Sequence, residues 1–345
     1  MKAVTLTGIR TLELIEEPKP EIVKADDVLI KVKVVGVCGS DIHYFESGRI
    51  GTQVVEYPFK VGHELAGVVE AVGSDVTRVK VGDEVAVEPA VVCHECDQCK
   101  SGRENTCRNN KFLGCPGQIE GCMCEYIVMP EENCFPTHGQ LTLDQAALCE
   151  PLPIGIYALN RAGVKPTDKI AILGGGPIGL CVMIAGKAMG ITDIFMTEKI
   201  PERIEVAKRG GANWVENPDM TDVVKECHSH FEFGVDVAIE CAGKQETLDD
   251  GIDMLKPGGK LIVVGIPTEE RVSFVADRYR RKEVTIFNIR RQNHCVQSAI
   301  DLIAKGNVDV DFMITHHFTL EQSQEAYDMV CDYKDGAVKA MITFD

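Results

Sequence analysis

The sequence lacks an excess of positive charge. Its 345 residues include 53 Asp and Glu but only 36 Lys and Arg, which gives a formal net charge of −17 at pH 7. Nucleic acids and anionic membranes are bound by clustered Lys and Arg side chains that meet phosphate groups. The composition therefore argues against either partner and favours a reaction on a small molecule.

Long apolar runs are missing as well. The first residues alternate apolar and polar side chains and contain no apolar segment of signal-peptide length. No other stretch approaches the ~20 apolar residues that a membrane span needs. We therefore expect a cytoplasmic protein. In that compartment the 15 cysteines are expected to be thiolate metal ligands and buried free thiols rather than disulfides.

The hydrophobic pattern predicts two kinds of folded unit, and the chain is longer than one hydrophobic core usually allows. Residues 1–155 contain short alternating segments separated by turns, typical of a β-rich domain. Residues 156–288 repeat the order strand then helix, typical of a doubly wound α/β domain. Residues 289–345 are expected to complete the first domain. Strands are expected at 28–37, 65–72, 84–87, 312–318 and 338–344, and helices at 296–304 and 320–330.

A glycine-rich turn indicates a dinucleotide site. The apolar strand Ile170–Leu173 runs directly into the turn, which opens an apolar helix. In a G-x-G-x-x-G turn the first glycine allows the tight bend, the second lets the backbone approach a pyrophosphate and the third allows close helix packing. The helix N-terminus offers N–H groups to the anion. The residues concerned are Gly174, Gly176, Pro177, Ile178 and Gly179.

An acidic residue at the end of the next predicted strand selects the cofactor. Glu198 can accept hydrogen bonds from the adenosine ribose and repel a 2′-phosphate, which favours NAD over NADP. Lys199 and Arg203 follow closely and weaken this preference; Lys199 is equally compatible with a solvated surface position, whereas Arg203 could flank the adenine ribose. A later strand end is a candidate for the nicotinamide side, with a plain core strand as the alternative. It consists of Val264, Gly265 and Ile266.

Four cysteines lie within fifteen residues in a polar segment. Cys93, Cys96, Cys99 and Cys107 have the spacing of a closed tetrahedral zinc site, which would organise a loop that buries little apolar surface. Because four protein ligands leave no position for a substrate, the sequence predicts a structural zinc here.

A second set of possible ligands is spread along the chain. Cys38, His63, Glu64 and Glu150 supply one thiolate, one imidazole and two carboxylates. Such a set can hold zinc and leave a place for an alcohol oxygen. Together with a dinucleotide fold, it predicts a catalytic zinc.

These residues match a known family. The sequence resembles the zinc-containing medium-chain dehydrogenases, and within them the sorbitol (L-iditol) dehydrogenase branch. The resemblance implies a GroES-like catalytic domain with a Rossmann domain inserted before its C-terminal part. It also implies zinc and NAD as cofactors and a homo-oligomer, a tetramer more often than a dimer. The segments that carry it are residues 38–44, 48–51, 62–64, 82–89, the four-cysteine segment, 150–155 and 174–179.

The resemblance also assigns roles. Cys38, His63 and Glu64 would hold the catalytic zinc, with Glu150 either a ligand or the holder of the zinc-bound water. Simple alcohol dehydrogenases carry a cysteine at this point, and Cys149 directly precedes Glu150, so a shift of one residue would change the ligand set. We favour Glu150, because the Pro-Leu-Pro-Ile-Gly that follows it keeps the family register.

The same resemblance gives substrate contacts. Tyr44, Phe112 and Glu150 match the polyol-contacting positions, and Arg290 matches an arginine that reaches substrate hydroxyls. Animal polyol dehydrogenases have Arg-Tyr there, whereas this chain has Arg290-Arg291, which leaves the identity of the polyol open.

The expected reaction is hydride transfer from a secondary alcohol of a polyol to NAD, which gives the ketose. Zinc would lower the pKa of the hydroxyl as a Lewis acid. Ser40 and His43, one helical turn apart, would pass the proton to solvent, or Glu150 would take it through water. Two alternatives are an L-threonine or sugar-acid dehydrogenase, with Arg290 or Arg291 binding the carboxylate, and an NAD sensor without catalysis. Buried free thiols are expected at Cys115, Cys122, Cys124 and Cys134.

Overall fold

The computed structural model describes residues 1–267 and 269–345. Two compact units account for the chain. Unit 1 consists of Met1–Glu150, Val296–Ala304 and Ile314–Asp345, and unit 2 consists of Pro151–Cys295 and Lys305–Met313. The domain boundaries expected after residues 155 and 288 remain predictions. No helix among the described residues is long and apolar enough to cross a membrane.

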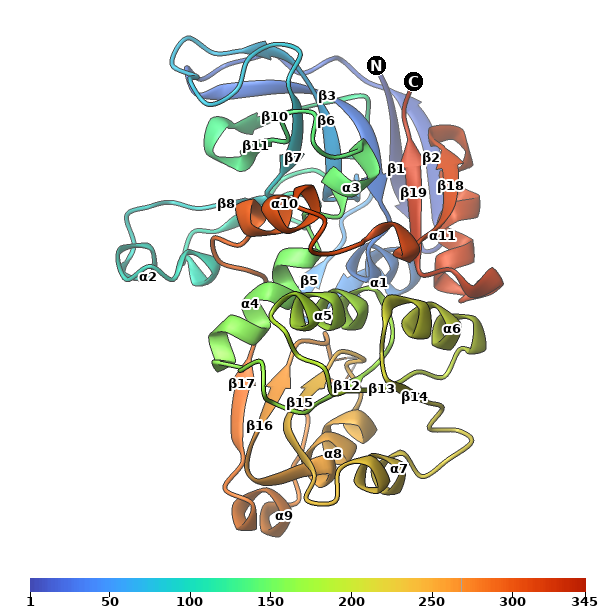
Figure 1. Ribbon diagram of the computed structural model, residues 1–345. Coiled ribbons are helices and arrows are strands. Elements are labelled where there is room, and N and C mark those ends of the chain that lie inside the picture. Colours follow the sequence, from blue (N-terminus) through green and yellow to red (C-terminus); the bar gives the residue numbers. More distant parts are fainter. Residues whose placement is uncertain (268) are drawn as a thin grey trace. The chain divides into compact units, whose positions relative to one another are not determined.

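Unit 1 is built on a seven-stranded sheet (Figure 1). The strands follow the order β11-β7-β6-β3-β19-β18, and β10 also pairs with β3. The valine, leucine and isoleucine side chains of the central strand β3 are buried, and several of them belong to the hydrophobic core of unit 1. The strands expected at 28–37, 65–72 and 84–87 are confirmed. The bounds are β3 Asp27–Gly36, β6 Glu64–Val72, β7 Glu84–Val87, β10 Tyr126–Pro130, β11 Cys134–Pro136, β18 Ile314–Thr319 and β19 Lys339–Thr343.

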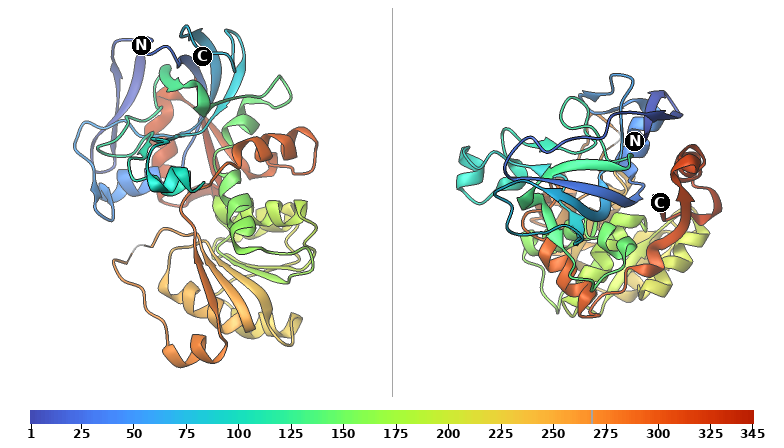
Figure 2. Two further views of the ribbon diagram at one scale, coloured as in Figure 1. Left: turned by 90° about the vertical axis from the view of Figure 1, so that its left-hand side faces the viewer. Right: turned by 90° about the horizontal axis from the view of Figure 1, so that it is seen from above.

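The C-terminal segment completes this sheet. Strand β19 runs antiparallel to β3, with Ile342 opposite Val35, and parallel to β18. Both chain ends therefore belong to unit 1, and they lie near one another at the same end of it (Figures 1 and 2). Helix α11 (Ser323–Cys331) seats Tyr327 against Phe45, with ring centroids 5.5 Å apart. The 3-10 turns η3 (Asp311–Met313) and η4 (Leu320–Gln322) shorten the expected strand and helix.

The smaller elements of unit 1 surround the sheet. Helix α1 begins after Cys38, and the short helix α2 lies within the four-cysteine segment. Helix α10 is confirmed over its expected range. The bounds are β1 Lys2–Gly8, β2 Thr11–Glu16, α1 Gly39–Ser47, β4 Arg49–Ile50, β5 Gln53–Val54, β8 Ala90–Val91, α2 Asp97–Lys100, η1 Glu104–Thr106, β9 Lys111–Phe112, η2 Glu131–Asn133, α3 Leu143–Ala147, α10 Val296–Ala304 and η5 Lys334–Gly336.

Unit 2 is a doubly wound α/β fold. Its six parallel strands follow the order β14-β13-β12-β15-β16-β17, so the strand order reverses between β12 and β15. Figure 1 shows α4, α5 and α6 on one face of this sheet and α7 and α8 on the other. This confirms the Rossmann-type architecture. The bounds are α4 Leu152–Ala162, β12 Ile170–Leu173, α5 Pro177–Ala188, β13 Ile194–Thr197, α6 Pro201–Gly210, β14 Trp214–Glu216, α7 Val223–His230, β15 Val235–Glu240, α8 Gln245–Met254, β16 Leu255–Val263, α9 Ala276–Arg281 and β17 Thr285–Asn288.

Candidate active site

The first predicted zinc ligand is the N-cap of helix α1. Cys38 has an extended backbone, and its N–H lies 3.3 Å from Oδ2 of Asp41, which closes a capping box. The other oxygen of Asp41 accepts a hydrogen bond from the N–H of Gly62 at 3.1 Å and lies 3.3 Å from Nδ1 of His63. One buried carboxylate therefore fixes both Cys38 and the segment that carries His63.

Three of the predicted ligands meet in unit 1. Ligand atoms of Cys38, His63 and Glu64 lie within 4.8 Å of one another. Burial lowers the pKa of His63, but the charges of Asp41 and Cys38 outweigh it and raise that pKa well above the usual value. Nδ1 of His63 is buried and has no hydrogen-bond partner among the described residues, and the Asp41 carboxylate lies 3.3 Å from it. Sulfur, imidazole and carboxylate are donors that zinc accepts, so the residues fit this metal.

Glu64 already has a cationic partner. Nζ of Lys339, on β19, lies 2.8 Å and 2.6 Å from the two carboxylate oxygens and 3.2 Å from the carbonyl oxygen of Val37. Both side chains are only 1% exposed. The pair links β6, β19 and Val37, the residue that follows β3. The charge of Lys339 balances one negative charge of the ligand cluster.

Glu150 lies close to this cluster but outside its tightest group. Burial raises the pKa of Glu150 to about 8, and the charges of His63 and Glu64 act on it. The preceding residue, Cys149, is buried, and its thiol donates to the carbonyl of Gln145 at 3.4 Å. The Cys149 thiol thus bonds to a backbone carbonyl, whereas Glu150 is close enough to His63 and Glu64 to be affected by their charges.

The predicted proton carriers lie on α1. The hydroxyl of Ser40 donates to the Cys38 sulfur at 3.4 Å, which puts it beside the cluster. His43 is half-buried one turn further along the helix.

Of the four predicted substrate contacts, three are in unit 1: Glu150, described above, Phe112 and Tyr44. The ring of Phe112 packs against the imidazole of His63, with centroids 5.4 Å apart. Tyr44 is buried, and its hydroxyl lies 3.5 Å from Oε1 of Gln53 and 3.8 Å from the sulfur of Cys115. Arg290 is exposed in unit 2, after β17.

The four-cysteine segment has the geometry of a metal site. Its sulfur atoms come within 4.8 Å of one another, with separations of 3.4 Å for Cys93–Cys107, 3.6 Å for Cys96–Cys99 and 3.9 Å for Cys96–Cys107. A tetrahedral Zn–S4 site with bonds of about 2.3 Å requires sulfur atoms roughly 3.8 Å apart. The N–H groups of Cys99 and Arg108 lower the pKa of Cys96 to about 6. The residues therefore fit zinc.

Four further cysteines of unit 1 are free thiols and buried, as expected. They are Cys115, Cys122, Cys124 and Cys134.

The glycine turn of unit 2 shows why each glycine is needed. Gly174 has φ +109°, which side chains rarely adopt. A Cβ on Gly179 would lie 1.9 Å from the carbonyl oxygen of Gly174, so α5 packs against the turn only with glycine there. A Cβ on Gly176 would meet nothing nearer than Nη1 of Arg203, at 3.8 Å. Open space beside Gly176 lets a ligand approach the backbone, with Pro177 and Ile178 starting α5 behind it.

Glu198 closes one side of this turn. Its carboxylate accepts hydrogen bonds from the N–H groups of Gly175 at 3.0 Å, Lys199 at 2.7 Å and Ile200 at 2.9 Å. Arg203 is 7% exposed and lies beside Gly176, whereas Lys199 pairs with Asp219 at the surface.

The predicted nicotinamide segment follows β16. The N–H groups of Val264 and Gly265 donate to the carbonyl oxygen of Glu240, at 2.9 Å and 3.0 Å. The side chain of Ile266 is 44% exposed.

Sequence reasoning missed Asp41 and Lys339. Asp41 is part of the Cys-Gly-Ser-Asp segment, and an acid three residues after an N-cap was an available signal for a capping box. Lys339 had no local signal, because its partner Glu64 is 275 residues away in the chain.

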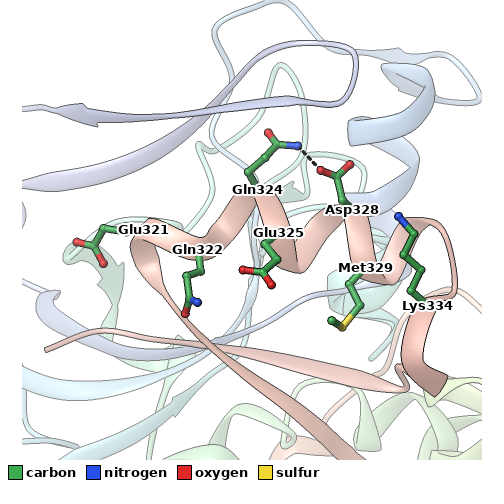
Figure 3. A pocket seen from close by; sticks show the side chains of 7 residues that line it. All are labelled: Glu321, Gln322, Gln324, Glu325, Asp328, Met329 and Lys334. Carbon is green, nitrogen blue, oxygen red and sulfur yellow. Dashed lines mark hydrogen bonds between the residues drawn. The ribbon is translucent and has the colours of Figure 1, made fainter.

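A surface pocket elsewhere in unit 1 shares no residue with this site. It has a volume of about 570 Å³ and lies along η4 and α11, where the side chains are mostly charged or polar and Gln324 donates to Asp328 at 2.8 Å (Figure 3). Its residues are Glu321, Gln322, Gln324, Glu325, Asp328, Met329 and Lys334.

The fold and these sites together define a class: a metal-dependent dehydrogenase with a Rossmann-type dinucleotide unit. Residues 24–139 match the family model of the alcohol dehydrogenase GroES-like domain, and residues 177–305 match that of the zinc-binding dehydrogenases.

Known proteins resemble nearly the whole chain. Sorbitol dehydrogenase of Bacillus subtilis is 40% identical over 99% of this chain and 97% of its own. L-Idonate 5-dehydrogenase of Vitis vinifera is 35% identical over 94% of this chain and 90% of its own. The crystal structure of 2R,3R-butanediol dehydrogenase from Bacillus subtilis has a TM-score of 0.90 at 31% identity, covering 100% of this chain and 99% of that one.

The chain belongs to the zinc-binding alcohol and polyol dehydrogenases of the medium-chain family. It is an NAD-dependent oxidoreductase that uses zinc and acts on a small-molecule alcohol.

Proposed function

We propose that this enzyme transfers a hydride from a secondary hydroxyl of a polyol to NAD and releases the ketose. The substrates meant are polyols of the sorbitol, xylitol or L-iditol type. The observation that carries the proposal is the buried cluster of Cys38, His63 and Glu64, with Glu150 beside it where simple alcohol dehydrogenases have a cysteine. The names of the relatives, which concern sorbitol and L-idonate, support the same substrate class.

Cys38, His63 and Glu64 would hold the catalytic zinc, with Glu150 as a further ligand or as the holder of a water. Cys93, Cys96, Cys99 and Cys107 would hold the structural zinc. When bound, the catalytic zinc supplies a Lewis acid that lowers the pKa of the substrate hydroxyl.

The protein orients these groups and removes the proton. The charge of the Asp41 carboxylate, 3.3 Å from Nδ1 of His63, favours a proton on that nitrogen and would orient the imidazole. The Ser40 hydroxyl lies at the cluster, and His43 follows one helical turn later, so the two form a short path for a proton toward solvent. Glu150 is the alternative acceptor through a water.

The dinucleotide unit aligns the hydride acceptor. The N–H groups at the start of α5 and the open space at Gly176 suit the pyrophosphate. Glu198, with Arg203 beside it, would bind the adenosine ribose. Val264, Gly265 and Ile266 would line the nicotinamide. Alignment and exclusion of water are what these residues contribute to the hydride step.

Four residues would contact the polyol. Tyr44, Phe112 and Glu150 belong to unit 1, where Phe112 packs against His63, and Arg290 belongs to unit 2. We further propose a cytoplasmic homotetramer, with a dimer as the other outcome of a mass measurement by light scattering. The resemblance of the whole chain to polyol dehydrogenases supports this assembly.

The substrate is tested by initial rates of NADH formation with zinc-loaded protein. The panel comprises sorbitol, xylitol, ribitol, L-iditol, galactitol, ethanol and L-threonine, with NADP as a parallel cofactor. The proposal expects fast turnover of one or more polyols with NAD. If only ethanol or L-threonine reacts, the polyol assignment is wrong.

A sugar acid is the second candidate substrate. The plant relative named for L-idonate and the two adjacent arginines, Arg290 and Arg291, favour it, because a guanidinium binds a carboxylate in a bidentate manner. Adding L-idonate to the panel of substrates decides between a polyol and a sugar acid. Faster turnover of L-idonate than of any polyol, lost in Arg290→Met, would establish the sugar-acid reading.

A further inference from the structure

A buried carboxylate lies at the reversal point of the Rossmann sheet. Glu240 is the last residue of β15 and is only 1% exposed. β15 pairs with β12, and the strand order reverses between these two strands. In doubly wound sheets, ligands bind outside the carboxyl ends of the strands at this point. Glu240 thus lies directly at the base of the expected dinucleotide crevice.

One oxygen of Glu240 collects three donors. Oε1 accepts hydrogen bonds from the N–H of Ala242 at 2.7 Å, the N–H of Gly243 at 2.6 Å and the hydroxyl of Thr247 at 2.8 Å. The same hydroxyl lies 2.8 Å from the carbonyl oxygen of Lys244, at the N-cap of α8, so its one proton is shared between the two acceptors. The carboxylate therefore fixes the turn of residues 241–244 and the first turn of the helix that follows.

This turn fits tightly between two parts of the cofactor site. On one side, a Cβ on Gly174 would lie 3.2 Å from both Cβ and N of Ala242. On the other side, a Cβ on Gly243 would lie 2.1 Å from the carbonyl oxygen of Ile266. The turn thus separates the glycine turn from the strand end after β16, and its position sets the distance between them.

We propose that Glu240 is a positioning residue for NAD. Its carboxylate holds residues 241–244 in place, and these residues keep the pyrophosphate turn at Gly174 and the nicotinamide segment at Ile266 in register. Glutamine keeps an oxygen for these three donors but loses the negative charge, so the hydrogen bonds that hold the turn become weaker. The inference rests on the proposed placement of NAD over the glycine turn.

The test compares NADH binding in zinc-loaded wild type and Glu240→Gln. Trp214 is the only tryptophan and lies in the same unit, so energy transfer from it to bound NADH reports affinity without turnover. We expect the dissociation constant of NADH and the KM for NAD to rise by about tenfold or more, because the hydrogen bonds at Oε1 lose their charged acceptor and weaken. The KM for the polyol and the zinc content should not change, and Glu240→Asp should recover part of the affinity.

Asp236→Asn is the matched control. Asp236 lies near the opposite, amino end of the same strand, where its carboxylate accepts a hydrogen bond from the N–H of Lys169 at 2.8 Å and pairs with Lys256. Removing a carboxylate with a purely structural role should lower the stability of the protein and leave its affinity for NADH unchanged. We expect this behaviour from Asp236→Asn and not from Glu240→Gln.

Thr247→Val serves if Glu240→Gln fails to fold, because it removes one donor and keeps the charge. It should weaken NADH binding several-fold in the same assay. Wild-type affinity in folded Glu240→Gln, or in Thr247→Val if only that variant folds, would overturn the inference. Gly176→Ala separates the two proposals: if it binds NADH as tightly as wild type, the placement of NAD over the turn is wrong and the inference falls with it. If it weakens binding while Glu240→Gln does not, only the inference is wrong.

Discussion

Replacing Lys339 with methionine should destabilise unit 1 strongly, because it leaves the Glu64 carboxylate buried without its cation. Lys339 is 1% exposed and donates to both oxygens of Glu64 and to the carbonyl of Val37. Methionine has nearly the same length and fills the same space. The substitution therefore removes the charge and the hydrogen bonds and creates little cavity.

The magnitude follows from the burial of both partners. Removing one member of a buried ion pair costs about 3–5 kcal/mol, because an uncompensated charge remains in the interior. For a unit of this size, each kcal/mol lowers Tm by about 2–4 °C, so Lys339→Met should melt about 6–20 °C below wild type. In zinc-loaded protein the loss should be smaller, because the metal gives Glu64 a second counter-charge.

The assay is calorimetry of metal-free and zinc-loaded protein, with the double variant Glu64→Gln/Lys339→Met as control. The double variant should recover most of the stability of the metal-free form, since the buried anion is gone. A Tm of Lys339→Met equal to that of wild type in both forms would show that the pair does not stabilise this site. Equal losses with and without zinc would show that Glu64 does not approach the metal.

Three further outcomes are expected. Cys107→Ser should lower the zinc content, measured by atomic emission, from two ions per chain to one. Glu150→Gln should reduce kcat by about 100-fold or more, whereas Cys149→Ala should retain wild-type activity and zinc; the reverse result would identify Cys149 as the ligand. Burial alone raises the pKa of Asp236, but its hydrogen-bonded partner Lys256 and the N–H of Lys169 lower it overall. Its stabilisation is therefore present above its ordinary pKa and lost as the pH falls through the lowered one, so the Tm difference between wild type and Asp236→Asn should stay constant near pH 7 and vanish in acid.

Features encoded by neighbouring residues could be predicted from the sequence. The four cysteines lie within fifteen residues, so their spacing alone indicated a closed metal site, and the structure brings their sulfur atoms together. The glycine turn was recognisable because a strand precedes it and a helix follows it. The repeating strand-helix order was enough to predict the doubly wound fold, since each such unit buries its own apolar face.

Features that depend on distant residues were not predictable in the same way. The charge on Lys339 gave no hint that the side chain is buried, because its partner Glu64 belongs to a strand far away in the chain. Glu240 ends an apolar strand, and the sequence does not show that three donors meet at its Oε1. In the proposed function, the choice of polyol would depend on the arrangement of side chains around Tyr44 and Glu150, which spacing along the chain does not encode.

The central claim is that Cys38 and its neighbours form the catalytic zinc site of an NAD-dependent polyol dehydrogenase. The most direct measurement is the initial rate of NADH formation from a reactive polyol by zinc-loaded wild type and Cys38→Ser, with NADH binding followed through Trp214. We predict that Cys38→Ser loses turnover and one zinc ion per chain but binds NADH with the affinity of the wild type. Full activity and full zinc content in Cys38→Ser would contradict it.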